Sequence, residues 1–171
     1  MLFFSRRAVL GLSGVLALGA CGFRPVHAPD GAGAVLRGQV RVQAPENRAE
    51  FHLVSRLEER LGRAGEGTRE GTGAARYALA FDVSIERRGT AVTSSNAITR
   101  IRLVGEAQFR ITRAGHTAPV HAGRVRSFTA YSTTGVAIAH TAPRRHAEER
   151  LMVVLADQIV ANLLSSAGHW P

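Results

Sequence analysis

Three stretches of the chain alternate apolar and polar residues, which is the period of a β-strand with one buried face. The clearest covers residues 77–86, where the apolar positions are Tyr77, Leu79, Phe81, Val83 and Ile85. A longer stretch follows at 97–112, and a shorter one at 36–43 precedes both. Residues 120–131 alternate poorly, which predicts a fourth strand that has a bulge or makes contacts on both faces.

Two other stretches repeat their apolar residues every three or four positions, the period of a helix with one buried stripe. The first follows Asn47, which forms a capping box with Glu50, and ends at Gly62 or Gly65. Its stripe is Phe51, Val54, Leu57 and Leu61. The second helix begins at Thr141. Its stripe is Leu151, Leu155, Ile159 and Leu163, widened by Met152, Val154 and Val160.

These elements follow one another in the order β-α-β-β-β-α. A Ser/Thr/Gly-rich turn at 87–96 and a hairpin turn at 113–116 join the later strands. Strands with one apolar face and helices with one apolar stripe must cover each other. The pattern therefore predicts an α+β, two-layer sandwich, in which a four-stranded, mostly antiparallel sheet carries two helices on one face. The second face is open to solvent or to a partner, and residues 35–168 form a single domain.

The first twenty residues have the pattern of an export signal. Arg6 and Arg7 precede an apolar stretch at 9–18 that is short and interrupted by glycines, unlike a membrane-spanning helix. The stretch ends in Leu18-Gly19-Ala20-Cys21, which resembles the lipobox of bacterial lipoproteins. The resemblance implies that residues 1–20 are a lipoprotein signal peptide. It also implies that Cys21 receives a diacylglyceryl group and becomes the first residue of the mature chain.

Two other interpretations of this region stay open. One is an ordinary secretory signal with a chance cysteine, and the other is a twin-arginine export motif at Ser5-Arg6-Arg7. Residues 21–34 are rich in Gly, Pro and Ala and are interpreted as a lipidated tether. Gly22 occupies the position where Asp usually marks lipoproteins for the inner membrane, so its presence favours the outer membrane.

Arginine supplies all of the formal positive charge. The 171 residues include 22 Lys or Arg, all of them Arg, and 13 Asp or Glu, for a net charge of +9. Removing residues 1–20 removes two arginines and no acid, which leaves +7. The lack of lysine excludes a P-loop and a Schiff-base enzyme, and the single cysteine excludes an internal disulfide and a cysteine-based zinc site. A basic exported protein meets phosphorylated lipids, above all lipopolysaccharide, and not nucleic acid.

Arrangements for catalysis or metal binding are missing from the sequence. The Gly-x-Ser stretch falls in the signal peptide, there is no His-Glu-x-x-His, and no nucleophile–base pair can be named. We therefore expect no catalytic residue, no metal site and no cofactor other than the covalent lipid on Cys21.

Arginines recur with strand spacing in the two later strands. Arg100, Arg102 and Arg110 share one face by parity, and Arg124 and Arg126 repeat the pattern on the next strand. A guanidinium fork pairs two phosphate oxygens at once, which makes these five side chains candidate contacts for lipopolysaccharide. The alternative is that they form the solvated face of a half-buried sheet.

Three further expectations concern the C-terminal half. Phe128 is expected to pack in the core, with contact to a partner protein as the alternative for Phe128 and Tyr131. Trp170, beyond the last helix, is expected at a frayed end. Arginines such as Arg144 near the start of the last helix oppose its dipole. Pairing with Glu148 and Glu149 is the favoured explanation for them, and phosphate contact is the alternative.

The lipobox followed by Cys21-Gly22-Phe23-Arg24-Pro25 is similar to the start of the lipopolysaccharide-assembly lipoprotein family LptE, in its alphaproteobacterial form. Residues 136–139 and 147–159 are similar to the family's C-terminal helix and the segment that leads into it. The order β-α-β-β-β-α is also the family's. The resemblance covers residues 21–168.

This resemblance implies a lipid-anchored protein on the periplasmic side of the outer membrane. It would bind the LptD barrel, plug its lumen, and help deliver lipopolysaccharide to the outer leaflet. The family's basic lipid contacts lie around the second-to-third strand region and just before the last helix. The second position falls on His140, and the first falls near Ser95, so that Arg100 and Arg102 are the nearest candidates. The rival hypothesis is an auxiliary lipid-binding lipoprotein of another envelope transport system.

Overall fold

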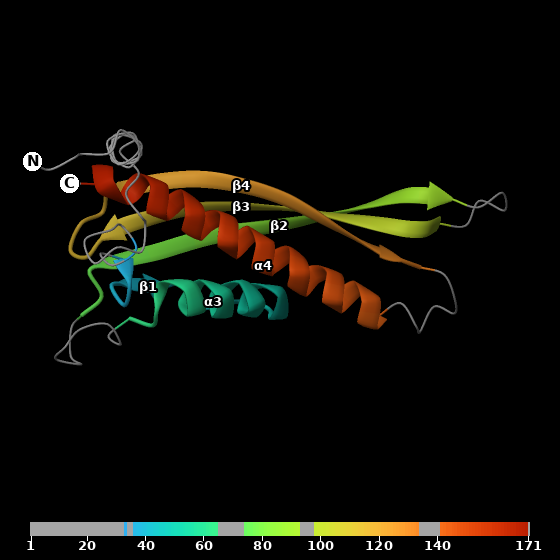
Figure 1. Ribbon diagram of the computed structural model, residues 1–171, viewed down its shortest axis with the longest axis horizontal. Helices are drawn as coiled ribbons and strands as arrows, with labels where there is room; N and C mark the ends of the chain where they lie inside the picture. Colours follow the sequence, from blue (N-terminus) through green and yellow to red (C-terminus); the bar gives the residue numbers. More distant parts are fainter. Residues whose placement is uncertain (1–32, 34–35, 65–73, 93–97, 134–140, 171) are drawn as a thin grey trace, which may run out of the picture.

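The computed structural model describes residue 33 and residues 36–64, 74–92, 98–133 and 141–170 (Figure 1). Its elements are β1 (Val40–Val42), α3 (Arg48–Leu61), β2 (Tyr77–Val92), β3 (Ile98–Arg113), β4 (Pro119–Ser132), α4 (Thr141–Ser166) and η2 (Ala167–His169). The predicted order β-α-β-β-β-α is confirmed. Cys21 and His140 lie outside the described residues, as do the predicted signal peptide and nearly all of the predicted tether.

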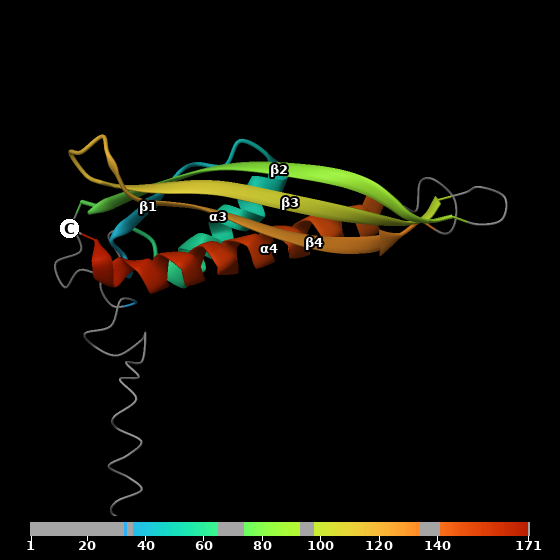
Figure 2. The same cartoon turned by 90° about the horizontal axis from the view of Figure 1, so that it is seen from above.

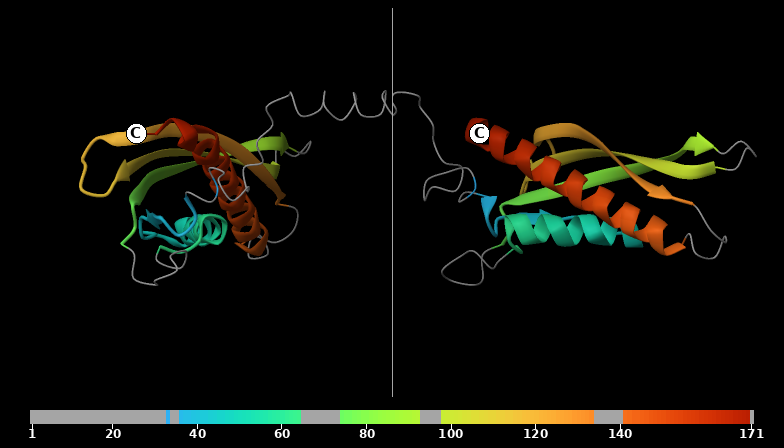
Figure 3. Two further views of the ribbon diagram at one scale, coloured as in Figure 1. Left: turned by 60° about the vertical axis from the view of Figure 1, so that its left-hand side comes forward. Right: turned by 45° about the vertical axis from the view of Figure 1, so that its right-hand side comes forward.

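The four strands form one sheet in the order β1-β2-β3-β4. β1 runs parallel to β2, and the other two pairs are antiparallel, as predicted. Both helices lie on the same side of the sheet, which leaves the other face uncovered (Figures 2 and 3). β1 pairs only with Tyr77–Leu79. Among the described strands, the rest of β2 therefore has β3 as its single neighbour.

Helix α4 forms the centre of the core. It crosses the sheet diagonally above β3 and β4, with α3 beside it (Figure 1). The predicted stripe residues Leu151, Leu155, Ile159 and Leu163 are all fully buried. By length and hydropathy alone, Thr141–His169 is also long and apolar enough to cross a membrane. Its apolar stripe is instead buried against the sheet and α3, which identifies it as a core helix.

Gly105 on β3 allows α4 to approach the sheet closely. A Cβ atom built at this position would lie 2.9 Å from Cδ2 of Leu151 and 3.0 Å from Cδ1 of Leu155. Carbon atoms of real side chains do not come so near, because repulsion rises steeply below van der Waals contact. Glycine is thus the residue that the contact between β3 and α4 requires.

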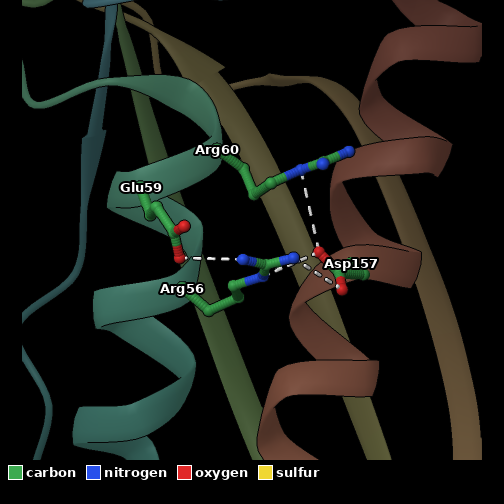
Figure 4. Close-up of polar contacts among 4 residues, drawn as sticks. All are labelled: Arg56, Glu59, Arg60 and Asp157. Carbon is green, nitrogen blue, oxygen red and sulfur yellow. Dashed lines mark hydrogen bonds and ion pairs between the residues drawn. The ribbon is translucent and has the colours of Figure 1, made fainter.

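The interface between α3 and α4 contains a small ion network (Figure 4). The Arg56 guanidinium donates to both carboxylate oxygens of Asp157, over 3.0 and 3.2 Å, and to Glu59 over 2.8 Å. Arg60 lies 3.7 Å from Asp157. The hydrogen bonds to Asp157 and Glu59 raise the pKa of Arg56 above its ordinary value. This network joins the two helices at the surface above their apolar contact.

The strand predicted at 36–43 is shorter than the pattern suggested. Gly38 has φ +69°, which turns the chain, and its N–H donates to the Leu61 carbonyl over 2.8 Å instead of entering the sheet. Leu36 is fully buried, as alternation requires, but it precedes the strand.

The turn predicted at 87–96 is wrong for its first residues, because these belong to strand β2. β2 continues through Val92, and Arg87 pairs with Leu103 and Arg88 with Arg102. The polar and glycine residues of this segment favour a turn locally, but β3 is long enough to hydrogen-bond to it across two register shifts.

Two residues assigned to the helix stripes are exposed. Phe51 is 57% exposed and Val154 is 39% exposed, while Leu53 is fully buried in the core. The predicted cap is confirmed, because the Asn47 side chain accepts from the Glu50 N–H over 3.0 Å. The Glu50 carboxylate accepts from the Glu46 N–H over 2.7 Å.

Trp170 is not at a frayed end. Its ring meets the Tyr77 ring edge-on at 5.4 Å and stacks on His121 at 6.2 Å. Its indole N–H donates to Ser166 Oγ over 3.2 Å, and His121 is held by Asn162 at 2.7 Å. Trp170 thus closes one end of the core, which explains why an aromatic residue lies so close to the C-terminus.

Candidate functional site

The uncovered face of the sheet carries the predicted arginines. Even-numbered residues of β2, β3 and β4 point to this face, while the odd-numbered ones pack toward the helices. The strand register places Arg88 beside Arg102, and Val104 beside Phe128. The face gathers arginines 88, 100, 102, 110, 124 and 126 and acids 82, 86 and 106. We call this surface the open face.

Phe128 lies at the centre of an arginine cluster on the open face. Its side chain is 64% exposed, so the expectation of core packing is wrong. The Arg102 guanidinium lies 5.0 Å from the centre of its ring, a cation–π contact. A shallow hollow of about 340 Å³ is lined here by Arg88, Arg102, Val104, Arg126, Ser127 and Phe128. We call it the arginine hollow.

Arg88 is already neutralised by a neighbour. Its guanidinium donates to both carboxylate oxygens of Glu86, over 2.9 and 2.8 Å. This bidentate hydrogen bond, helped by the charges of Arg88 and Arg126, lowers the pKa of Glu86 below its ordinary value. The same bond raises the pKa of Arg88. Glu86 therefore stays ionised and holds Arg88 at the rim of the hollow.

Arg102 and Arg126 have no such neutralising partner. Within the described part of the chain, no carboxylate oxygen lies within 4 Å of either guanidinium. Arg126 faces Glu106 in the register, but Glu106 pairs instead with Arg124, over 3.2 Å. These two cations beside an exposed aromatic ring form the part of the open face best suited to an anion.

The five arginines predicted as one group do not lie together. Arg100 and Arg102 are neighbours on the same face of β3. Arg126 on β4 lies across from Glu106, four residues along β3 from Arg102, and shares only the arginine hollow with Arg102. Arg124 is paired with Glu106. Arg110 is eight residues from Arg102 along β3, roughly 27 Å for an extended strand. A single headgroup therefore does not bridge Arg102 and Arg110.

Of the residues that line the hollow, the sequence predicts only Arg102 and Arg126 as lipid contacts. Arg88 falls in the predicted turn, although the even parity of Ser84 and Glu86 continues through it. Val104 is an apolar exception on a polar face, and its register partner Phe128 explains it. Val104 and Phe128 together form an apolar strip within a cationic surface.

Of the arginines at the start of α4, one is paired with a glutamate as predicted. Arg144 Nε lies 3.3 Å from Glu148 Oε1, so the pairing explanation holds for this residue. Arg150 donates to the Ala130 carbonyl over 3.4 Å, which ties α4 to β4.

The open face has the chemistry of a binding surface. Arginine forks suit phosphate oxygens, and the strip of Val104 and Phe128 suits an apolar group attached to the phosphate. Over the described ranges, no three His, Cys, Asp or Glu side chains are grouped as metal ligands.

A profile of the family described as "LptE: Lipopolysaccharide-assembly" matches residues 37–163. No curated protein matches the chain. Among solved structures, a chain from Caulobacter crescentus is similar over 80% of this chain and 96% of its own, with TM-score 0.62 and 19% identity.

Rare lipoprotein B from Shewanella oneidensis is similar over 75% of this chain and 93% of its own, with TM-score 0.53 and 14% identity. A minor lipoprotein from Acinetobacter baumannii is similar over 77% and 91%, with TM-score 0.52 and 14% identity. At such identities these structures support the fold.

Proposed function

Because the chain belongs to the LptE lipopolysaccharide-assembly family, we propose that it is a non-catalytic outer-membrane lipoprotein that binds lipopolysaccharide and partners the LptD barrel. In this proposal Cys21 carries the lipid anchor, residues 21–34 are the tether, and residues 35–168 are the working domain. The domain plugs the barrel lumen while lipopolysaccharide passes to the outer leaflet.

The arginine hollow is the observation that carries the binding proposal. Lipid A presents phosphates on a sugar that also bears acyl chains. Arg102 and Arg126 offer two cations without a carboxylate within 4 Å in the described part of the chain. Phe128 and Val104 offer an apolar surface between them. A phosphate next to an apolar group matches this pair of features better than a free inorganic anion does.

The remaining arginines take secondary roles in this proposal. Arg100 extends the cationic surface along β3, and Arg124 and Arg110 add charge farther along the open face. His140 stays a predicted contact on the family's pattern. An envelope protein of this charge meets lipopolysaccharide before any nucleic acid.

Lipopolysaccharide binding is tested by reversing the two cations of the hollow. In Arg102→Glu/Arg126→Glu, we expect affinity for purified lipopolysaccharide to fall at least about 10-fold, since each charge-assisted hydrogen bond contributes about 1.5–3 kcal/mol. Arg48→Glu/Arg63→Glu makes the same change of charge at exposed positions at the start of α3 and just after its end, away from the open face, and is the matched control. Titration calorimetry of the full lipoprotein gives both affinities. Equal affinity in the wild type and the hollow variant would place the ligand elsewhere.

The barrel partnership is tested by crosslinking from the open face in cells. Recovery of a large outer-membrane barrel protein supports the proposal. Recovery only with inner-membrane transport proteins would favour an auxiliary subunit of another envelope lipid transporter.

A further inference from the structure

Three exposed arginines gather at the end of the domain where the described chain begins. Leu36 is fully buried at this end, and Arg37 follows it directly. β1, the last turn of α3 and η2 all lie here, opposite the far ends of β2 and β3 (Figure 1). Arg41 lies on β1, and Arg76 directly precedes β2. We call Arg37, Arg41 and Arg76 the anchor-end arginines.

Backbone hydrogen bonds hold the segments that carry these arginines together. The Gly38 N–H, next to Arg37, donates to the Leu61 carbonyl over 2.8 Å. The Tyr77 N–H donates to the Gln39 carbonyl over 2.9 Å, and the Arg76 carbonyl accepts from Ala114 over 2.8 Å. Residues far apart in sequence therefore form one rigid end of the domain.

Arg41 and Arg76 lie on the same face of the sheet, whereas Arg37 lines a shallow hollow together with Glu58 and Glu59 of α3. Arg41 pairs in register with Ala78, and Arg76 lies two residues before Ala78. Arg41 and Arg76 are therefore diagonal neighbours on adjacent segments, with backbones roughly 7 Å apart. Like charges at that spacing repel. Within the described residues, no carboxylate lies within 4 Å of any anchor-end arginine, whereas nearby Arg63 pairs with Glu58 over 3.2 Å. An external anionic surface would relieve this repulsion.

We propose that the anchor-end arginines dock the domain on an anionic phospholipid surface, as a second membrane contact beside the lipid on Cys21. The inference rests on the proposed anchor. The proposed tether joins the domain at this end, and the 15 residues from Cys21 to Leu36 span at most about 50 Å, so the anchor keeps these arginines within that distance of the bilayer. Each arginine close to an anionic bilayer strengthens binding about fivefold, and a basic patch complements an acyl anchor.

This docking surface is separate from the arginine hollow. Arg88 lies eleven positions beyond Tyr77 along the extended strand β2, roughly 36 Å. One end of the domain thus faces the bilayer, while the other holds the lipid in transit. The separation lets each surface be altered without the other.

Trp170 provides a probe at the docking end. It is the chain's only tryptophan, and its ring lies 5.4 Å from the Tyr77 ring, over which the Arg76 guanidinium sits at 5.9 Å. The full lipoprotein is reconstituted into phosphatidylcholine vesicles with or without phosphatidylglycerol, each carrying a dansyl headgroup lipid. We expect more energy transfer from Trp170 to dansyl on the vesicles that contain phosphatidylglycerol. Because salt screens exposed charges, the excess should fall as salt is added.

Charge reversal at the anchor end gives the decisive comparison. In Arg41→Glu/Arg76→Glu, we expect the ratio of docked to undocked protein to fall at least about 25-fold, two factors of about five, so that transfer drops to the phosphatidylcholine value. Arg48→Glu/Arg145→Glu is the matched control and should transfer like the wild type. Equal transfer on both vesicle types, or an equal loss in the control, would overturn the proposal. So would loss of the excess transfer when soluble lipopolysaccharide is added to the Arg102→Glu/Arg126→Glu variant, because the end would then be a lipopolysaccharide site.

The anchor itself is measured separately by the mass of the Cys21 side chain. If the thiol is unmodified, the chain's single cysteine is coupled to a maleimide lipid in the vesicle, and the same transfer is recorded. A missing natural anchor thus contradicts the proposed function, while the transfer measurement still decides whether the anchor-end arginines dock on anionic phospholipid.

Discussion

The two faces of strand β3 differ although they alternate along the same residues. On the inner side, Leu103 and Gly105 are covered completely by the helices. On the outer side, Arg102 is exposed and Val104 half-buried. The inner face holds the domain together through apolar contact with α4, and the outer face presents charge and one strip of apolar surface. Odd-numbered residues of this one strand thus contribute to stability, and even-numbered residues form the surface available for binding.

The largest effect should come from the inner side. Leu155→Ala removes a fully buried side chain that contacts the sheet near Gly105, and we expect the free energy of unfolding to fall by about 2–5 kcal/mol. Urea denaturation measures the change. Val154→Ala, on the exposed side of the same helix turn, should lower it by less than about 1 kcal/mol. Equal losses would mean that α4 does not pack as described.

A smaller loss is expected when the close approach itself is blocked. Gly105→Val places atoms where Leu151 and Leu155 lie, and overpacking of this kind costs about 1–3 kcal/mol. Thermal unfolding followed by circular dichroism reports the difference. Gln108→Val adds the same side chain on the open face and should leave stability nearly unchanged. A stable Gly105→Val protein would show that the helix can move away from the sheet.

On the outer side, a mutation should affect binding without affecting folding. Phe128→Ser removes the ring beneath Arg102, and we expect stability to stay within about 0.5 kcal/mol of the wild type. Affinity for lipopolysaccharide should fall about fivefold with the loss of the cation–π contact and the apolar strip. Calorimetric titration and urea denaturation of the same protein separate the two effects. A large loss of stability would mean that Phe128 supports the fold.

The smallest effect concerns pH. Glu86 has a lowered pKa in the folded protein, so its contribution to stability is present above the ordinary pKa of glutamate and disappears as pH falls through the lowered value. In Arg88→Gln the main cause of that shift is gone, and we expect the pKa of Glu86 to move back toward its ordinary value. An NMR titration of the Glu86 carboxyl carbon measures both pKa values. An unchanged pKa would assign the shift to Arg126 instead.

The hydrophobic pattern was sufficient to predict the architecture, because burial on one side of an element shows in its own sequence. The stripe of α4 and the alternation of β2 and β3 were both placed correctly. The errors arose where long-range contacts decide. Gly38 turns the chain because its N–H finds Leu61, and Trp170 is held by Tyr77 and His121. None of these three partners is close in sequence to the residue that it holds.

The arginine hollow could be predicted only in part for the same reason. Parity placed Arg100, Arg102 and Arg126 on one face, and the sequence can give no more than that. The register between strands decides that Phe128 meets Val104 and Arg102, and that Glu106 neutralises Arg124 and not Arg126. Register depends on pairing across the whole sheet, so the unpaired cations could be identified only in the folded protein.

The three-residue length of β1 has a consequence for the backbone of β2. The backbone N–H and carbonyl groups of odd-numbered β2 residues face the side where β1 lies. The Tyr77 N–H donates to the Gln39 carbonyl, and the Leu79 carbonyl accepts from the Gln43 N–H. The next such group, the Phe81 N–H, reaches only the Gln43 side chain, over 3.4 Å. Beyond that point the amides of Val83 and Ile85 point toward an edge where the described residues supply no strand partner, while those of Ser84 and Glu86 bond to β3. Deuterium should therefore enter this strand at every second residue.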